Sequence, residues 1–164
     1  MNAVTKLLTF AITLYASGTL AEETESSNLN ILDYDNFYEL VMDKESNTVK
    51  GENGWFVKFY APWCGHCQRL APTWEQLADE TKGQLNVAKV DCTSDNGKPL
   101  CQQFEVRGYP TLLWFPTDLI ENGEGAAQKN YYKFQGPRSL DEFKSFSLGG
   151  DWVNAEADEI PKNL

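Results

Sequence analysis

The feature that most constrains the fold is a buried-strand pattern that passes directly into a helix pattern within residues 55–77. Residues 55–60 read WFVKFY, an aromatic and β-branched run typical of a largely buried strand. Pro62 and Gly65 interrupt this run. Helical spacing then relates Leu70, Trp74, Leu77, Ala78 and Thr81. The tetrapeptide CGHC, residues 64–67, therefore lies where the predicted strand turns into the predicted helix.

The position of Cys64 and Cys67 at a helix start favours thiol chemistry. The first N–H groups of a helix lack intrahelical partners and the helix dipole is positive there, so both favour a thiolate at Cys64. The thiolate is the nucleophilic form of cysteine. Cys67 lies one turn into the predicted helix and should be shielded. We therefore expect Cys64 to attack a disulfide and Cys67 to resolve the mixed disulfide, with Gly65 and His66 between them.

The alternatives for this pair are a zinc half-site and a purely structural disulfide. Zinc would need Cys92 and Cys101 as further ligands, and the eight residues between them do not match the spacing of a second zinc knuckle. We therefore expect no metal. The four cysteines of the chain allow two disulfides, and adjacency favours 64–67 and 92–101. We expect the second to be structural, while a second redox pair or two free thiols stay open for Cys92 and Cys101.

Two motifs resemble those of a known family. Residues 61–67, APWCGHC, resemble the active-site motif of the protein disulfide isomerases in the thioredoxin superfamily. Residues 106–111, VRGYPT, resemble the loop before the cis-proline of that family. The resemblance extends from about residue 28 to residue 146. It is strongest to the domains of the member called thioredoxin domain-containing protein five, over residues 59–74 and 90–93.

The predicted order of elements indicates the fold class. The order β-α-β-α-β-α-β-β-α, with right-handed crossovers, gives an α/β protein with a central mixed sheet and helices on both faces. The resemblance implies that this is the thioredoxin fold. It also implies a thiol–disulfide oxidoreductase or isomerase that forms, reduces or rearranges disulfides in folding secretory proteins and uses no cofactor. The alternative is a redox-dependent chaperone or client-binding adaptor that uses the same surface.

Residues around the two cysteines take their expected roles from position and from the resemblance. His66 is the only histidine, and a charged imidazole would stabilise the thiolate of the first cysteine and make the disulfide more oxidising. Pro110 corresponds to the cis-proline of the family, and a cis X–Pro bond costs little free energy. Trp63, Tyr109 and Pro110 are then expected to form an apolar rim that binds unfolded chains.

Two basic residues are expected to act on Cys67. Arg107 matches a family arginine that approaches the active cysteines and tunes the pKa of the resolving thiol; the alternative is a solvated surface charge. Lys58 stands six residues before Cys64, where the family carries a buried acidic residue that accepts the proton of the resolving thiol. A buried neutral amine would take over as the base, and a charged one would stabilise the Cys67 thiolate directly. The alternative is a side chain that reaches solvent along its aliphatic stem.

Four segments are predicted: a signal peptide over residues 1–21, an acidic lead-in over residues 22–27, a folded domain over residues 28–148 and an acidic, disordered tail over residues 149–164. The signal peptide has a positive start at Lys6, an apolar stretch over residues 7–16 and small residues before a cut after Ala21. A membrane anchor is the alternative, but the apolar stretch is shorter than the ~20 residues that a span needs. No later stretch is long and apolar enough, so we expect no membrane span after cleavage.

Charge and the chain end set the expected partners and compartment. The net charge of −10 argues against nucleic acid, whose phosphates need a basic surface. We expect a monomer that meets unfolded or misfolded secretory proteins with cysteines and is served by an upstream thiol oxidase or glutathione. The expected compartment is the lumen of the endoplasmic reticulum. The given sequence does not end in KDEL or HDEL, the retention signals of the endoplasmic reticulum. Three alternatives therefore stay open: a partner retains the protein, the protein is secreted, or the chain is longer than the given sequence.

Overall fold

The computed structural model describes residues 28–46, 48–117, 120–122, 126–128 and 130–159. The predicted signal peptide and lead-in, residues 1–27, lie outside these ranges. Within the described ranges, no helix has both the length and the apolar character needed to cross a membrane.

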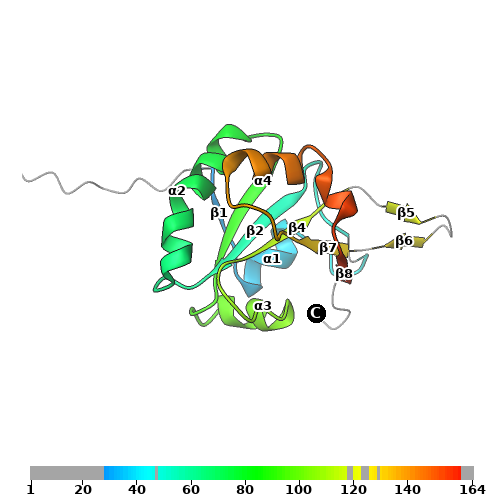
Figure 1. The fold of residues 1–164 in the computed structure, drawn as a ribbon. Helices are drawn as coiled ribbons and strands as arrows, with labels where there is room; N and C mark the ends of the chain where they lie inside the picture. The colour runs from blue at the N-terminus through cyan, green and yellow to red at the C-terminus, as the bar shows by residue number, and fades with distance from the viewer. Residues whose placement is uncertain (1–27, 47, 118–119, 123–125, 129, 160–164) are drawn as a thin grey trace, which may run out of the picture.

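The centre of the fold is a six-stranded mixed sheet (Figure 1). Its strands, in spatial order, are β1 (Asn30–Ile31), β3 (Asn86–Asp91), β2 (Trp55–Tyr60), β4 (Thr111–Phe115), β7 (Asn130–Lys133) and β8 (Ala157–Glu159). Strands β1, β3 and β2 are parallel, and β4, β7 and β8 each run antiparallel to the strand before them in this order. A separate hairpin consists of β5 (Ile120–Asn122) and β6 (Ala126–Gln128).

Helices cover both faces of the sheet, as predicted (Figure 1). One face packs against α1 (Tyr34–Leu40) and α3 (Gly97–Gln103), and the other against α2 (Gly65–Glu80) and α4 (Leu140–Ser147). Successive side chains of β2 alternate between these faces. Val57 and Phe59 enter the core beneath α1 and α3, and Phe56 enters the core beneath α2 and α4. A strand buried on both faces reads as a continuous apolar run, which explains the sequence WFVKFY.

A disordered tail was predicted for residues 149–164, but residues 149–159 form regular structure, and residues 160–164 lie outside the described residues. A turn at Gly150, whose φ is 82°, leads into a 3₁₀ helix (Asp151–Asn154), and β8 then pairs with β7. Trp152 is 6% exposed, and its ring centre lies 4.9 Å from that of Tyr132 on β7. Burial of a large apolar side chain stabilises a fold by about 1.5–3 kcal/mol, and β8 satisfies the open edge of β7. The residues around Trp152 are mostly acidic, and such a composition favours disorder, so the sequence did not predict this packing.

Candidate active site: two thiols at the start of a helix

The end of β2 leads the chain directly into α2, and Cys64 occupies the junction as predicted. Cys64 is the N-cap residue of α2, with an extended backbone (φ −76°, ψ 112°). Its N–H donates to the Ala61 carbonyl at 3.0 Å, which forms the turn after β2. Its sulfur accepts the Cys67 N–H at 3.3 Å. The sulfur therefore takes the place of the side-chain oxygen that caps most helices, and receives one of the unpaired N–H groups of α2.

The surroundings of Cys64 favour its thiolate. Burial, the largest single influence, raises the pKa of Cys64, but the opposing contacts together lower that pKa below its ordinary value. They are a hydrogen bond from the Cys67 thiol, the backbone N–H groups of Cys67 and His66, and the charge of Arg138. Hydrogen bonds to the charged form favour ionisation, as at other helix N-termini.

The surroundings of Cys67 have the opposite effect. Burial, followed by the hydrogen bond that this thiol donates to the Cys64 sulfur, raises the pKa of the Cys67 thiol, and the net value is about 11. A backbone contact with Ala61 and the charge of Lys58 lower it in part. Both thiols are free in the structure. The pair therefore consists of one thiol that ionises readily and one that keeps its proton, which supports the expected order of attack and resolution.

The loop before β4 closes the site over Cys64. The peptide bond between Tyr109 and Pro110 is cis, as predicted for this loop. The Tyr109 carbonyl accepts a hydrogen bond from the Cys64 thiol at 3.5 Å. The Tyr109 ring lies edge-on to the Trp63 ring, with centres 6.0 Å apart. Since Trp63 is 72% exposed, the two rings form an apolar rim that is open to solvent beside the sulfur.

A groove of about 530 Å³ continues from this rim along the sheet. Pro110 lines the groove near the cysteines, and Tyr131, Lys133 and Asp158 line it on β7 and β8. The groove is more polar than the rim, because its lining combines charged side chains with aromatic ones. An extended peptide that reaches Cys64 could therefore lie along both.

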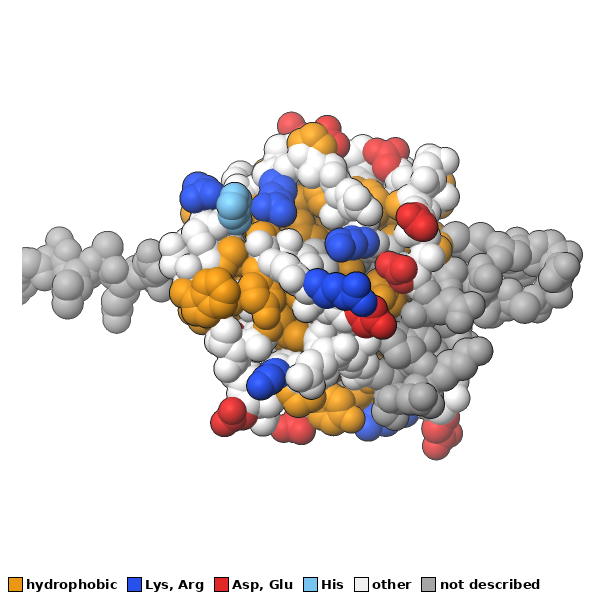
Figure 2. Space-filling model, turned by 60° about the horizontal axis from the view of Figure 1, so that its bottom comes forward, with side chains coloured by type: hydrophobic (Ala, Val, Ile, Leu, Met, Phe, Trp, Pro, Cys, Tyr) orange, Lys and Arg blue, Asp and Glu red, His pale blue; other side chains and the backbone are white. Residues whose placement is uncertain are grey.

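Gly65 and His66 form the exposed first turn of α2. His66 acts on Cys64 through its backbone N–H, which lowers the pKa of the thiol. Figure 2 shows the pale-blue histidine with a Lys or Arg side chain on each side of it and hydrophobic side chains below it. A Cβ at Gly65 would meet the Arg69 side chain at 3.5 Å, an ordinary contact, so packing does not require glycine there.

The structure places Arg107 away from the expected role. Its side chain is 86% exposed and pairs with Glu105 at 3.0 Å. Arg107 is thus the solvated surface charge that the sequence left as the alternative. The arginine that acts on Cys64 is instead Arg138, in the segment before α4. No local pattern in the sequence indicates Arg138, because only the packing of α4 against α2 brings it near the site.

Lys58 is buried in the middle of β2, with 3% of its surface exposed. Its Nζ lies 5.5 Å from the centre of the Tyr60 ring and 5.8 Å from that of the Trp74 ring. The alternative of a side chain that reaches solvent is therefore wrong. The charge of Lys58 lowers the pKa of Cys67, and the expected role of Lys58 in resolution stays a prediction.

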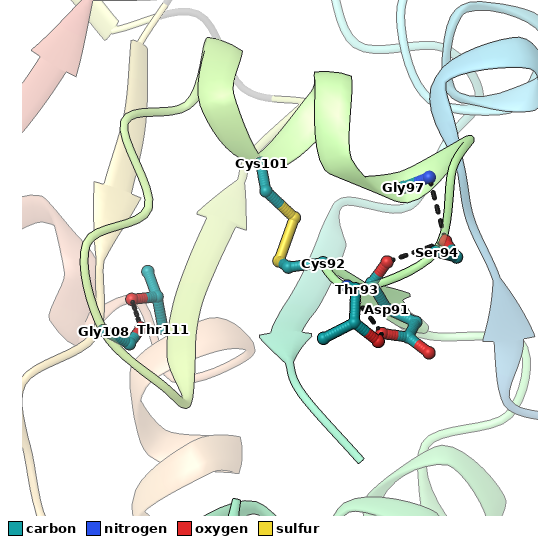
Figure 3. Close-up of a disulfide and its surroundings, with 8 residues drawn as sticks. All are labelled: Asp91, Cys92, Thr93, Ser94, Gly97, Cys101, Gly108 and Thr111. Carbon is teal, nitrogen blue, oxygen red and sulfur yellow. Dashed lines mark hydrogen bonds between the residues drawn. A yellow bond between two sulfur atoms is a disulfide. The ribbon is translucent and has the colours of Figure 1, made fainter. Parts of the chain in front are cut away.

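Cys92 and Cys101 form the predicted disulfide, with Cα atoms 5.7 Å apart (Figure 3). The bridge joins the end of β3 to α3, and both residues are buried. Because each sulfur is bonded to the other, neither can be a zinc ligand. Helix α3 starts at Gly97, where a Cβ would lie 2.0 Å from the Asp91 carbonyl oxygen, so only glycine fits this close turn. The Cys101 carbonyl accepts the Val106 N–H at 2.9 Å, which connects the bridge to the loop before β4.

The comparisons with known proteins agree with this geometry. The chain matches the thioredoxin family over residues 29–146. It is 38% identical over 149 residues to a thioredoxin domain-containing protein of Theileria parva, covering 91% of this chain and 60% of the relative. It is 44% identical over 111 residues to a thioredoxin domain-containing protein 5 homolog of Drosophila melanogaster, covering 66% and 24%. Protein disulfide-isomerase 1 of Dictyostelium discoideum is 36% identical over 162 residues, covering 97% and 39%.

The chain thus spans 60% or less of the length of these three relatives. Among solved structures, the Trx4 domain of ERdj5 superposes with a TM-score of 0.57 at 28% identity, covering 75% of this chain and 95% of that domain. The first thioredoxin domain of mouse protein disulfide-isomerase A4 superposes with a TM-score of 0.54 at 26% identity, covering 84% and 91%. The fold is the thioredoxin fold, and the chain belongs to the thioredoxin family.

Proposed function

We propose that this chain is a thiol–disulfide oxidoreductase and isomerase that acts on proteins with cysteines. The observation that carries the proposal is the unequal pair at the start of α2. The pKa of Cys64 is lowered by hydrogen bonds and charge that outweigh its burial, and the pKa of Cys67 is raised by burial to about 11. Relatives named protein disulfide isomerase support the same activity.

The proposed reaction needs only the two sulfurs and the client. The Cys64 thiolate attacks one sulfur of a client disulfide, the client S–S bond breaks, and the first client sulfur leaves as a thiolate that takes a proton from water. Cys67 then loses its proton to water and attacks the Cys64 sulfur, which releases the second client thiolate. Two electrons pass from the dithiol to the client. The reverse sequence oxidises a client dithiol, and both directions together rearrange disulfides.

The stabilised Cys64 thiolate supports an oxidising or isomerising role. Stabilising the thiolate stabilises the reduced form, which makes the Cys64–Cys67 disulfide a stronger oxidant. Typical potentials are about −180 mV for protein disulfide isomerase and about −270 mV for thioredoxin, a gap of about 4 kcal/mol. We expect this dithiol to lie nearer the first value, with the His66 backbone N–H among the groups that stabilise the Cys64 thiolate.

Client binding is assigned to the rim of Trp63, Tyr109 and Pro110 and to the groove beyond it. Trp63 offers exposed apolar surface next to the nucleophile and Tyr109 is partly exposed, whereas Pro110 is buried and lines the groove. The Tyr109 carbonyl lies at the sulfur itself. Packing does not require glycine at position 65, so we propose that Gly65 serves to leave the Cys64 sulfur accessible. The second candidate function, a chaperone or adaptor that holds clients without exchange, uses this same rim.

The proposed compartment is the secretory pathway, and within it the lumen of the endoplasmic reticulum. The Cys92–Cys101 disulfide supports this, because such bridges persist in oxidising compartments. The pattern of a signal peptide over residues 1–21 supports it too. The proposed partners are unfolded secretory proteins with cysteines, and a thiol oxidase or glutathione that restores the oxidised dithiol. We expect the chain to act as a monomer.

The test is oxidative refolding of a reduced, denatured ribonuclease in a glutathione buffer. The wild-type chain should speed recovery of ribonuclease activity, Cys64→Ser should abolish the effect, and Cys67→Ser should accumulate mixed disulfides with the client. A chain that suppresses client aggregation equally well in all three forms, without changing the rate of disulfide formation, would be the chaperone or adaptor instead. Faster alkylation of Cys67 than of Cys64 at pH 7 would reverse the two assigned roles.

A further inference from the structure

A lysine in the core of the sheet is a group that the proposed reaction does not yet use. Lysine is rarely fully buried in proteins, and Lys58 is only 3% exposed. It lies at the centre of β2, in register with Lys89 on β3 and with Leu112 on β4. Side chains two residues apart on a strand point to the same face of the sheet. Phe56, two residues before Lys58, packs beneath α2 and α4. Lys58 therefore points toward the layer that contains α2, not toward solvent.

Two aromatic rings connect the amine of Lys58 to Cys67. Tyr60, whose ring centre is 5.5 Å from Nζ, packs against the cluster of Ala61, Cys64 and Cys67. Trp74, whose ring centre is 5.8 Å from Nζ, belongs with Cys67 to the buried face of α2. The amine thus lies beneath the same helix face that carries the resolving cysteine.

The rings also favour one charge state of the amine. The face of an aromatic ring attracts a cation, and the attraction grows when the cation is removed from water. Burial alone opposes a charge, but two ring contacts and a nearby thiolate both stabilise the ammonium. In a site of low dielectric constant, a cation acts on a neighbouring anion much more strongly than at the surface.

We propose, resting on the proposed function, that Lys58 is a positioning residue whose buried ammonium stabilises the Cys67 thiolate during resolution of the mixed disulfide. Once Cys64 is bonded to a client sulfur, its sulfur is no longer a thiolate that accepts the hydrogen bond from the Cys67 thiol. Cys67 then gives its proton to water, and the ammonium of Lys58 holds the resulting thiolate until it attacks the Cys64 sulfur. The bond from Cys64 to the client breaks, and the client thiolate leaves and takes a proton from water.

The first experiment measures the ionisation of Cys67 directly, without a client. In a Cys64→Ser background, the rate of Cys67 alkylation by iodoacetamide is followed from pH 6 to pH 11. Lys58→Met should move the midpoint of this profile upward and slow alkylation at pH 8 about tenfold, the effect of one pKa unit. The matched control is Lys89→Met, which removes a lysine in register on the neighbouring strand but only partly buried. The control profile should overlay that of the Cys64→Ser parent.

Further controls address the titratable groups that act on Cys67 or pack against it. Cys64 on α2 is replaced in the background, and Lys58 is the second charged group that acts on the thiol. Tyr60 on β2 and Tyr109 in the loop before β4 pack against the same cluster. Tyr60→Phe and Tyr109→Phe in the same background should each leave the alkylation profile unchanged. A shift produced by Lys58→Met and by neither of these therefore belongs to the lysine.

The second experiment separates the two steps of exchange with a labelled disulfide peptide in single turnover. In Lys58→Met the first attack by Cys64 should stay within about twofold of wild type. Release of the peptide should be about tenfold slower at pH 7, and the gap should close as the pH rises and Cys67 ionises in both proteins. Lys58→Arg, which keeps the charge, should restore much of the release rate. Should Lys58→Met fail to fold by circular dichroism, Lys58→Gln takes its place as the neutral variant.

Superimposable alkylation profiles for Lys58→Met and its parent would overturn the inference, as would a loss of release rate that is the same at every pH. The alkylation profile needs no client turnover. A wild-type chain that fails to refold ribonuclease but shows the shift would therefore refute the proposed function and leave the link between Lys58 and Cys67 intact.

Discussion

The bridge between Cys92 and Cys101 makes a quantitative prediction about stability. Its two residues are nine apart in sequence, and closing a loop of that size lowers the entropy of the unfolded chain by an amount equal to about 2.6 kcal/mol at 25 °C. Replacing both residues with alanine should therefore lower the free energy of unfolding by about 2.6 kcal/mol. For a domain of this size, that corresponds to a shift of about 1–2 M in the urea midpoint.

The assay is urea unfolding without reductant, followed by tryptophan fluorescence. The matched control is Cys64→Ser combined with Cys67→Ser, which removes the other cysteine pair and keeps the bridge, and its midpoint should stay near that of wild type. A Cys92→Ala/Cys101→Ala variant with the wild-type midpoint would refute the structural role. Loss of disulfide exchange at unchanged stability would instead identify the bridge as a second redox pair.

Three further predictions concern the site and the tail. The folded-state pKa of Cys67 is raised, chiefly by burial, to about 11 from an ordinary value of 9.0. The unfolded chain therefore loses this proton first, and the dithiol form should lose stability as the pH rises from 9 to 11. In urea unfolding over this pH range, Cys67→Ser should lose less stability than the wild type. Trp152→Ala should lower the free energy of unfolding by about 3–5 kcal/mol, whereas the exposed Val153→Ala should change it by less than about 0.5 kcal/mol, and equal effects would contradict the packing described for the tail. Trp63→Ala should raise KM for a disulfide peptide severalfold and leave the pH profile of Cys64 alkylation unchanged, because its exposed ring meets the client and not the sulfur.

The parts of this molecule that the sequence predicts are those set by local patterns. The run over residues 55–60 and the helical spacing after Gly65 are sufficient to place β2, α2 and the two thiols between them. The cis bond at Pro110 was predicted from the resemblance of residues 106–111 to a loop of a known family, and the structure confirms it. The bridge of Cys92 and Cys101 was predictable because its partners lie within one strand–helix turn.

The features that could not be predicted from the sequence depend on contacts between distant segments. Arg138 comes near Cys64 through the packing of α4 on α2. No sequence pattern around Arg138 indicates this packing. Arg107 lies in a motif that resembles a functional one, but its side chain reaches solvent and pairs with Glu105. Trp152 stands in an acidic segment whose composition favours disorder, yet one aromatic contact with Tyr132 and a strand pairing are enough to order it.

Strand β8 also limits the ways in which a client can attach to the sheet. Many proteins bind extended peptides by letting them pair with an open strand edge. In the described part of the chain, β7 already pairs with β4 on one side and with β8 on the other. A client strand therefore cannot augment the sheet at β7, and the backbone contact left beside the nucleophile is the Tyr109 carbonyl. Under the proposed function, we therefore expect substrate choice to depend on a short segment around the reacting cysteine, so that clients with unrelated sequences share one site.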